Sequence, residues 1–393
     1  MLRQLFAVSL MNLRSLPARW GTASVVVICL AGVAGVMVSM LAMAEGFDST
    51  FRRAGRADRV IVLTTGETYE AASSIARDQV TPLLSAPGLR QLPDGKPAAV
   101  IERLTMSALP LARSGRDGNL LLRGVSEKAW EVRPEVHIVA GRNFTPGLRE
   151  LVVGRTAQSE FTGLQLGGTV SLSGIGWTVV GIFASGGSAF ESEAWADLEV
   201  VMDAYHQPSY SSITALLQSA AAFQQYKDAV TTNPQLNHSP IAEPDFYAAQ
   251  GGTLATAMRV VGWLVAVIMS LGALFAAINT LYASVESRTV EIATLRALGF
   301  GSAPVIGSVL LEAIVLCVIG AVTGGVLAYL LFNGYTVSTL GGANFTQIQF
   351  AFAVTPALFA QGVLWSCGLG LIGGVPPAVS AARLPVAEAL RGG

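Results

Sequence analysis

Cysteine and charge are scarce in this 393-residue chain, and each scarcity removes a class of protein. The three cysteines, Cys29, Cys317 and Cys367, all lie in apolar runs, so the polar middle of the chain has no disulfide framework and a cysteine-based metal site is not expected. Only 13% of the residues are charged, with a formal net charge of -1 and no basic stripe, which argues against a nucleic-acid partner. Because 52% of the residues are hydrophobic, the composition fits a membrane part joined to a polar domain.

The motifs of common catalytic sites are also missing from the sequence. The histidines, His137, His206 and His238, are isolated, with no His-Glu-x-x-His pattern, and no Gly-x-Ser-x-Gly elbow occurs. No lysine follows the glycine spacing of a nucleotide-binding P-loop, and the nearest candidate is Gly95-Lys96-Pro97. Gly174-Ile-Gly176 lies among predicted strands and is interpreted as a hairpin turn. We therefore predict no catalytic residue, no cofactor site and no metal site in this chain.

Long uncharged runs predict four membrane spans. The first, Trp20 to Ala44, has about 25 residues, enough to cross a hydrocarbon core of ~30 Å. It resembles the core of a cleaved signal peptide but is longer than the usual ~7–15 residues, so we expect a retained span. The segment before it, from Met1, mixes arginine with apolar residues and suits a helix at the membrane surface. The other spans are expected at 260–285, 313–332 and 356–377.

Glu312 interrupts the third apolar run and leaves two registers open. If the span begins near Ser302, the carboxylate lies ~15 Å deep at 1.5 Å per residue, where a charge is costly and marks a functional site. If the residues after Glu312 cross the membrane by themselves, the carboxylate lies at the cytoplasmic interface. The second register costs less, and we expect it.

The polar domain, residues 45–250, mixes two kinds of predicted element. Short runs rich in β-branched residues and bounded by Gly, Pro, Asn or Asp predict strands. Strands are expected at 59–63, 98–101, 119–124, 135–139, 150–153, 169–172, 178–183, 198–202 and 212–217. Helices are expected at 45–56, 69–84, 155–161, 220–231 and 243–258. The mixture predicts an α+β domain.

A charged island, residues 284–301, separates the second and third spans. Residues 260–285 on one side carry no charge, and residues 313–382 on the other contain no Asp, Glu, Lys, Arg or His. The charges of the island alternate in sign, and Arg288 and Glu291 would pair at i,i+3 on a helix. The island is therefore a helical loop, either an ordinary polar connection or a docking element for a soluble partner.

The arginine distribution predicts the orientation of the chain. Arginines cluster before the first span, in the charged island and after the fourth span: Arg3, Arg14, Arg19, Arg288, Arg296, Arg383 and Arg391. The loop at 333–354 has none. By the positive-inside rule, both termini and the charged island lie in the cytoplasm and the polar domain lies outside.

Two short motifs resemble a known family. Residues 288–299, RTVEIATLRALG, are similar to the loop that follows the second membrane helix in MacB/FtsX-type ABC transporter permeases, where it contacts the ATPase. Residues 377–391, PAVSAARLPVAEALR, resemble the closing motif of the same family. Segments of the polar domain also look like the extracytoplasmic domain of these permeases: 141–144, 150–155, 166–167, 177–183 and 190–195.

The resemblance implies a fold class and a division of the chain. The fold class is a polytopic α-helical membrane protein with four transmembrane helices and a large extracytoplasmic α+β domain inserted between spans 1 and 2. Residues 1–44 would hold the interfacial helix and transmembrane helix 1, residues 45–250 the extracytoplasmic domain, and residues 251–393 transmembrane helices 2–4. Within the domain, the resemblance implies a porter-like part formed by residues 58–124 and 210–242. It also implies a β-rich insert at residues 125–209.

The function implied is that of a permease subunit, not itself an enzyme, in the bacterial inner membrane. It would couple ATP hydrolysis by a separate ATPase to an outside conformational change and so drive export, a mode called mechanotransmission. The partners implied are two copies of an ABC ATPase that bind ATP and Mg²⁺, a second permease in a homodimer, a periplasmic adaptor protein and the lipid bilayer. The alternatives are an FtsX-like regulator of a cell-wall hydrolase and a permease that extracts lipoproteins or lipids. The motif at 190–195 favours the MacB-like, efflux branch.

Two sets of residues are candidate sites. The set expected to contact the ATPase lies in the charged island: Glu286, Arg288, Glu291, Ile292, Leu295, Arg296 and Leu298. The second set is the glycine pairs Gly320/Gly324 and Gly370/Gly374, whose spacing lets membrane helices approach closely. Packing within one subunit and a dimer contact are both open for these glycines.

Overall fold

The computed structural model describes residues 20–341 and 346–383, which form two compact units. The membrane unit comprises the described residues of Met1–Glu45, Thr256–Tyr335 and Phe352–Gly393, and the α/β unit comprises those of Gly46–Ala255 and Thr336–Ala351. The predicted surface helix before Trp20 and the end of the closing motif, residues 384–391, lie outside the described residues. The division into a porter-like part and an insert stays a prediction.

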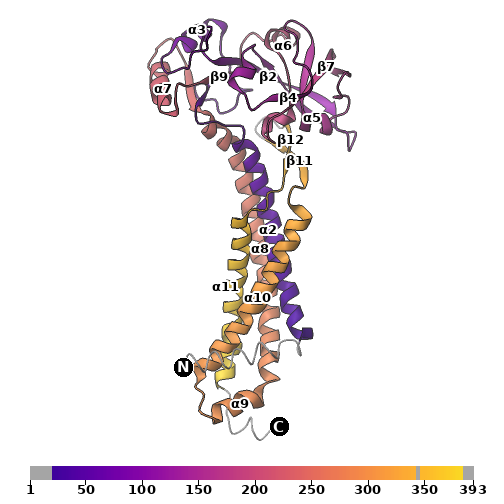
Figure 1. Ribbon diagram of the computed structural model, residues 1–393, viewed down its shortest axis with the longest axis vertical. Coiled ribbons are helices and arrows are strands. Elements are labelled where there is room, and N and C mark those ends of the chain that lie inside the picture. Colours follow the sequence, from indigo (N-terminus) through magenta and orange to yellow (C-terminus); the bar gives the residue numbers. More distant parts are fainter. Residues whose placement is uncertain (1–19, 342–345, 384–393) are drawn as a thin grey trace. The chain divides into compact units, whose positions relative to one another are not determined.

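Within the described residues, four helices are long and apolar enough to cross a membrane, as predicted. They are α2 (Trp20–Arg52), α8 (Glu243–Glu286), α10 (Ser302–Phe332) and α11 (Pro356–Arg383). Figure 1 shows them running side by side. Their buried faces meet in a cluster that includes Leu30, Ala273 and Leu316, with Trp365 packed against it. The boundaries between the two units fall inside α2 and α8.

Two of these helices differ from the boundaries that the sequence predicts. α10 begins at Ser302, so Glu312 lies inside the helix rather than before it, and the level of the membrane along α10 stays a prediction. α11 was expected to end at Pro376 and Pro377 but continues to Arg383. Each proline removes one backbone hydrogen bond. The helix continues because residues beyond the prolines, such as Ala378 and Ala381, are buried against other helices.

A mixed sheet forms the frame of the α/β unit. Ten strands of the described chain follow the order β10-β1-β9-β2-β3-β8-β5-β7-β4, with β6 paired to β7. The bounds are β1 Arg59–Thr64, β2 Ala99–Pro110, β3 Asp117–Val125, β4 His137–Gly141, β5 Glu150–Gly154, β6 Thr169–Leu172, β7 Ile175–Ala184, β8 Glu193–Asp197, β9 Ser212–Leu216 and β10 His238–Ala242. β3 pairs with β8, and β5 with β7, in parallel, and the other pairs are antiparallel.

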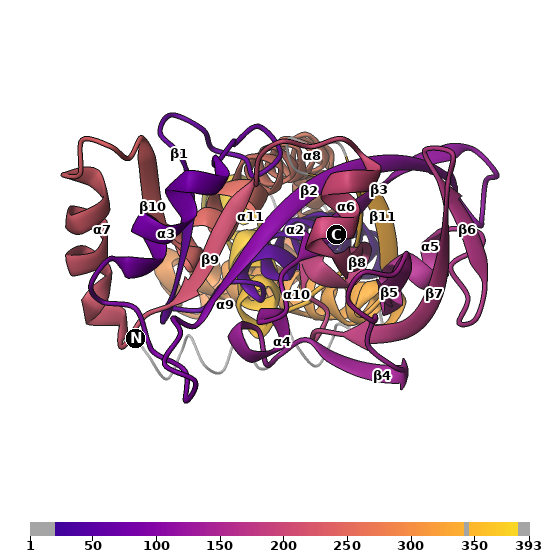
Figure 2. The same ribbon diagram turned by 90° about the horizontal axis from the view of Figure 1, so that it is seen from above.

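Short helices cover the sheet and enclose two apolar cores. They are α3 (Arg77–Ser85), α4 (Ala129–Val132), α5 (Arg155–Glu160), α6 (Leu198–Ala204), α7 (Phe223–Thr231), η2 (Ala189–Ser192) and η3 (Ala220–Ala222). Figure 2 shows α3 and α7 at the β10 end of the sheet and α5 at the β7 end. Tyr226 and Val60 belong to one core, and Trp177 and Leu151 belong to the other.

Several elements of the α/β unit correct the sequence-based predictions. Residues 198–202, expected as a strand, form α6 because the Asp197 carboxylate accepts a hydrogen bond from the Val200 backbone nitrogen (3.0 Å) and caps a helix. The helix expected over 69–84 begins only at Arg77. The hairpin expected near Gly174 is confirmed, since Ser173 and Gly174 join β6 to β7 with φ of 52° and 81°. A second hairpin, β11 (Thr336–Gly341) with β12 (Thr346–Ala351), was not predicted.

Candidate functional site

The charged island folds as a short helix between α8 and α10. α9 covers Thr289–Ala297, with Arg288 at its N-cap position. Gly299, which follows the helix, has a φ of 93°, the left-handed conformation that glycine adopts at helix ends without steric cost. The helical character predicted for this segment is confirmed.

A buried ion pair fixes the beginning of α9. The Arg288 Nη1 atom donates to Glu312 Oε2 on α10 (3.3 Å), and the two side chains are only 9% and 6% exposed. The Ser284 hydroxyl, near the end of α8, donates to the other oxygen of Glu312 (3.4 Å). A buried charge deprived of its partner is strongly destabilising. Glu312 therefore joins α8, α9 and α10. The sequence did not predict this role, because it suggested Glu291 as the partner of Arg288.

The inner face of α9 is apolar. Ile292 is buried in a cluster with Val285, Val305 and Ala378, which belong to α8, α10 and α11. Leu295 and Arg296 are half-buried. A cavity of about 20 Å³ lies beside this face, and Arg288 and Glu312 are among the residues that line it. The helix is therefore held by apolar packing as well as by the ion pair.

The outer face of α9 is exposed and mixed in character. Val290, Thr294 and Leu298 follow one another at intervals of four and share one row of the helix, with Glu291 on the adjacent row. Leu298 is 72% exposed, and Glu286, at the end of α8, is exposed as well. The predicted coupling residues thus divide, with Arg288 and Ile292 anchoring the helix and Glu286, Glu291 and Leu298 facing outward.

All four predicted glycines pack against helices of this same chain. A Cβ atom added to Gly320 would lie 2.9 Å from Leu30 Cβ on α2, and one added to Gly324 would overlap the backbone of Ala31. On α11, an added Cβ at Gly370 would meet Cys317 and one at Gly374 would lie 3.1 Å from Ala313 Cβ. Close packing of α10 with α2 and α11 accounts for these glycines.

The α/β unit contains a second set of charges that the sequence did not indicate. We call it the charge cluster, and its members are all buried: Arg59, Glu70, Glu102, Arg123, Arg133, Glu193 and Glu243. Arg59 and Glu243 are 184 positions apart in the chain, so no spacing motif relates them. The sequence contains one weak signal of such a cluster, which is a charged residue next to or within an apolar strand-like run. Glu102 in β2 is an example.

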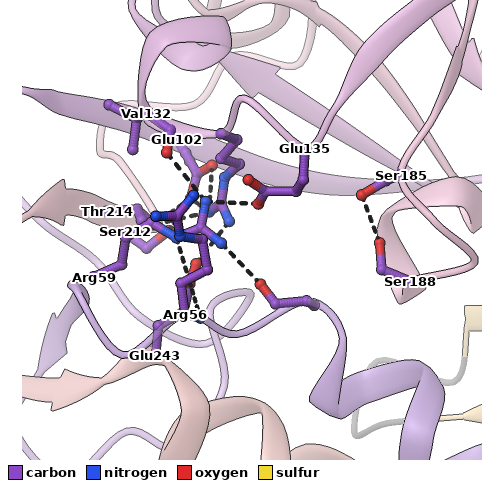
Figure 3. Close-up of polar contacts among 12 residues, drawn as sticks. Arg56, Arg59, Glu102, Val132, Glu135, Ser185, Ser188, Ser212, Thr214 and Glu243 are labelled. Carbon is purple, nitrogen blue, oxygen red and sulfur yellow. Dashed lines mark hydrogen bonds and ion pairs between the residues drawn. The ribbon is translucent and has the colours of Figure 1, made fainter.

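The cluster is organised by three arginines. Arg123 donates to Glu193 through Nε (2.7 Å) and Nη2 (2.8 Å) and to Glu70 through Nη1 (2.8 Å). Arg133 donates through Nη2 to Glu102 (3.0 Å) and through Nη1 to Glu243 (2.8 Å). Arg59 donates to Glu243 through Nε (2.5 Å). Arg59 also pairs with Glu135 through Nη1 (2.6 Å), and Figure 3 shows Arg59 with Glu135 and Glu243, with Glu102 in the same group.

The buried surroundings shift the pKa values of the cluster in different directions, and burial raises the pKa of Glu243 above its ordinary value despite the guanidinium groups of Arg133 and Arg59. Burial alone raises the pKa of Glu102, but the guanidinium groups of Arg133 and Arg123 outweigh it, so the pKa lies below its ordinary value. Burial lowers the pKa of Arg123, and the carboxylates of Glu193, Glu70 and Glu102 raise it well above the ordinary value. Both groups remain charged at neutral pH, so neither suits proton transfer. The described residues contain no group of histidine, cysteine and acidic side chains that would hold a metal ion.

Two family models together match most of the chain. Residues 21–233 match the MacB-like periplasmic core domain, and residues 263–386 match the FtsX-like permease C-terminal region. The first match contains the α/β unit up to α7, and the second contains α9, α10 and α11.

Individual relatives cover parts of the chain. The macrolide export ATP-binding/permease protein MacB of Sodalis glossinidius is 33% identical over 138 residues, which are 35% of this chain and 19% of that protein. The uncharacterized ABC transporter permease YknZ of Bacillus subtilis is 26% identical over 243 residues, covering 58% of this chain and 57% of that protein. The crystal structure of the periplasmic region of MacB from Actinobacillus actinomycetemcomitans has a TM-score of 0.37 and 12% identity, covering 50% of this chain and 94% of that one.

These relatives are longer than the parts that match, since the chain spans about a fifth of the MacB relative and little more than half of YknZ. The family models, by contrast, match more than half of the chain, in the order that the fold requires, with a large α/β domain between the first and second membrane helices. The chain is a multi-pass membrane protein and belongs to the MacB/FtsX family of ABC transporter permeases.

Proposed function

We propose that this chain is the permease of an ABC exporter and that α9 is its contact with a separate ATPase subunit. The observation that carries the proposal is the outer face of α9, where Val290 and Leu298 are exposed beside the carboxylate of Glu291. Exposed apolar residues next to charge suit a protein interface, because burial of the apolar groups supplies affinity and the charges supply orientation.

The anchoring of α9 supports its role in transmitting movement. The Arg288–Glu312 pair and buried Ile292 hold the helix against α8, α10 and α11. A push on the outer face would therefore reach these helices rather than bend a loose loop. α8 carries the movement onward, because it is one continuous helix of 44 residues whose first part belongs to the α/β unit. In this proposal the α/β unit changes conformation on the extracytoplasmic side of the membrane and drives export.

The assembly follows from the same proposal. Two ATPase copies, which bind ATP and Mg²⁺, dock on two permeases that form a homodimer in the bacterial inner membrane. Both termini and α9 face the cytoplasm, as the arginine distribution predicts. A periplasmic adaptor would bind the α/β unit. Export of small molecules is favoured over signalling because relatives bear names such as macrolide export MacB and pyoverdine export PvdT.

Charge reversal on the outer face tests the docking. Glu291→Lys should weaken co-purification of the ATPase subunit, by a few kcal/mol if the carboxylate is buried in the interface and by far less if it stays at a solvated rim. Arg296→Glu, which reverses a half-buried charge at the side of α9 rather than on its outer face, should act in the same direction. Glu131→Lys, which reverses an exposed charge in the α/β unit, is the control and should leave co-purification unchanged. Complete co-purification and full ATP hydrolysis by complexes of both α9 variants would refute the proposal.

A further inference from the structure

Glu243 connects the start of α8 to the segment that leaves α2. It is the first residue of α8, and its side chain is fully buried. Its Oε2 atom accepts hydrogen bonds from the backbone nitrogen of Arg56 (3.0 Å), which follows α2, and from Arg59 Nε (2.5 Å) at the start of β1. Its Oε1 atom accepts from Arg133 Nη1 (2.8 Å). One carboxylate thus holds three segments that are far apart in the sequence.

The backbones at this point are also in close contact. A Cβ atom on Gly55 would lie 2.8 Å from Pro244 Cα and 3.1 Å from the Glu243 carbonyl oxygen, so a side chain at position 55 has no room. Arg59 Nη2 donates to the Ala54 carbonyl oxygen (3.1 Å) and ties the same segment to β1. α8 begins at the residue directly after β10, so the helix and the sheet are joined without a flexible connection.

The contacts of Glu243 extend into the sheet. Arg133, which binds Glu243, also donates to Glu102 on β2 and to the Thr214 hydroxyl on β9 (3.0 Å each). Arg59 Nη1 donates to the Val132 carbonyl oxygen (3.1 Å). Figure 3 shows Glu102, Val132, Thr214 and Glu243 in one group with Arg59. If the start of α8 moved away from the sheet, several buried charges would lose their partners together, and such charges are the most costly to leave unpaired.

We propose that the charge cluster is a rigid joint and that Glu243 is its positioning residue, through which a movement of α8 reaches the sheet. The inference rests on the proposed function, because that function supplies the movement of α8. It adds a specific consequence. The first turns of α8, the end of α2 and the sheet move as one body, whereas a hinge at this point would let α8 rotate while the sheet stays in place.

A distance measurement on the protein with the charge cluster intact tests rigidity directly. Spin labels are placed at Thr253 on α8 and Gln224 on α7, both exposed and both in the α/β unit, after Cys29, Cys317 and Cys367 are replaced by serine. With the labelled chain diluted in an excess of unlabelled chain, so that a homodimer carries at most one labelled subunit, pulsed electron paramagnetic resonance should give one narrow distance for the permease alone. The same distance should persist in the complex with the ATPase and ATP. A shift between the two states would overturn the rigid joint.

Removal of the charge tests the role of Glu243. Glu243→Gln keeps the size of the side chain but leaves Arg59 and Arg133 with one carboxylate fewer, and the single narrow distance should be lost. Glu150→Gln is the matched control, because it removes the carboxylate partner of Arg142 outside the cluster and should keep the narrow distance. A Glu243→Gln protein that retains the narrow distance would contradict the role of this residue.

The rigid joint and the docking of the ATPase on α9 can be disproved independently of each other. The distance in the permease alone requires no ATPase, so it reports on the joint whether or not α9 is the docking site. If Glu243→Gln does not fold, the labelled chain that retains Glu243 still tests the rigid joint, because its distance is compared between the permease alone and the complex with the ATPase and ATP.

Discussion

At the residue scale, Glu312 is the side chain of α10 that binds the beginning of α9. Its two oxygens bind Arg288 and Ser284, and all three groups come from different elements or their junctions. Replacing a buried ion pair by apolar groups of similar size is often neutral, but removing one partner leaves an uncompensated charge. A comparison of a single and a double variant therefore shows whether α9 is held by the ion pair or by either side chain independently.

The single variant Glu312→Ala should loosen α9, with a cost of up to roughly 3–5 kcal/mol because the buried Arg288 guanidinium loses the Glu312 carboxylate. Hydrogen exchange of the α9 amides should accelerate accordingly. The double variant Arg288→Met, Glu312→Ala removes both charges and should recover most of the protection. Equal exchange in the single variant and the native chain would show that the ion pair does not hold the helix.

A second prediction at this scale concerns acid. Arg142 donates two hydrogen bonds to Glu150, which also accepts from the Thr145 backbone nitrogen (2.8 Å), and these contacts lower the pKa of Glu150 from 4.5 to about 2. A lowered pKa means stability that is present above pH 4.5 and is lost as the pH falls toward 2. Glu150→Gln should therefore flatten this part of the pH dependence of the melting temperature. An unchanged acid profile would contradict the assignment.

At the scale of elements, the sequence predicted the membrane helices better than the sheet. Long uncharged runs define a membrane helix whatever packs against it, and the charged island was recognisable because it interrupts such runs. The strands are short, and their identity depends on neighbours. Residues 198–202 have a strand-like composition, yet the cap at Asp197 makes them helical.

The charge cluster, like the strands, could not be predicted because it depends on contacts between distant parts of the chain. Its arginines and glutamates come together only when β1, β2, β3, β8, the segment after β1, the end of α4 and the first residue of α8 are assembled. Nothing in the local sequence around Glu243 identifies its partners Arg59 and Arg133. The sequence also does not distinguish the exposed face of α9 from its anchoring face, because that distinction depends on how α10 and α11 pack against the helix. Glu312, which pairs with Arg288, lies on α10.

The packing of α10 against α2 gives a prediction at this scale. Gly324→Ala inserts a methyl group against the backbone of Ala31, and overpacking of this kind costs about 1–3 kcal/mol. Gly272→Ala on α8 is the matched control, because an added Cβ there meets no described atom within 4 Å. Alanine has the higher helix propensity, so the control should melt at the same or a higher temperature. Equal melting temperatures of the two variants in detergent would contradict the close approach of α10 and α2.

At the scale of the whole molecule, the chain consists of two units of different character. The membrane unit contains four long helices and carries α9, and the α/β unit contains the sheet and the charge cluster. α2 and α8 have residues in both units. The central claim is that an ATPase acts on α9 and that the α/β unit responds.

The most direct test is photo-crosslinking from the outer face of α9 in intact cells. A photoreactive amino acid replaces Leu298, and the same residue at Leu148, an exposed leucine of the α/β unit, is the control. We expect a covalent adduct from position 298 that contains an ABC ATPase, identified by mass spectrometry, and no such adduct from position 148. Absence of an ATPase adduct at position 298 in cells that produce both proteins, or equal adducts from both positions, would contradict the proposed contact between α9 and the ATPase.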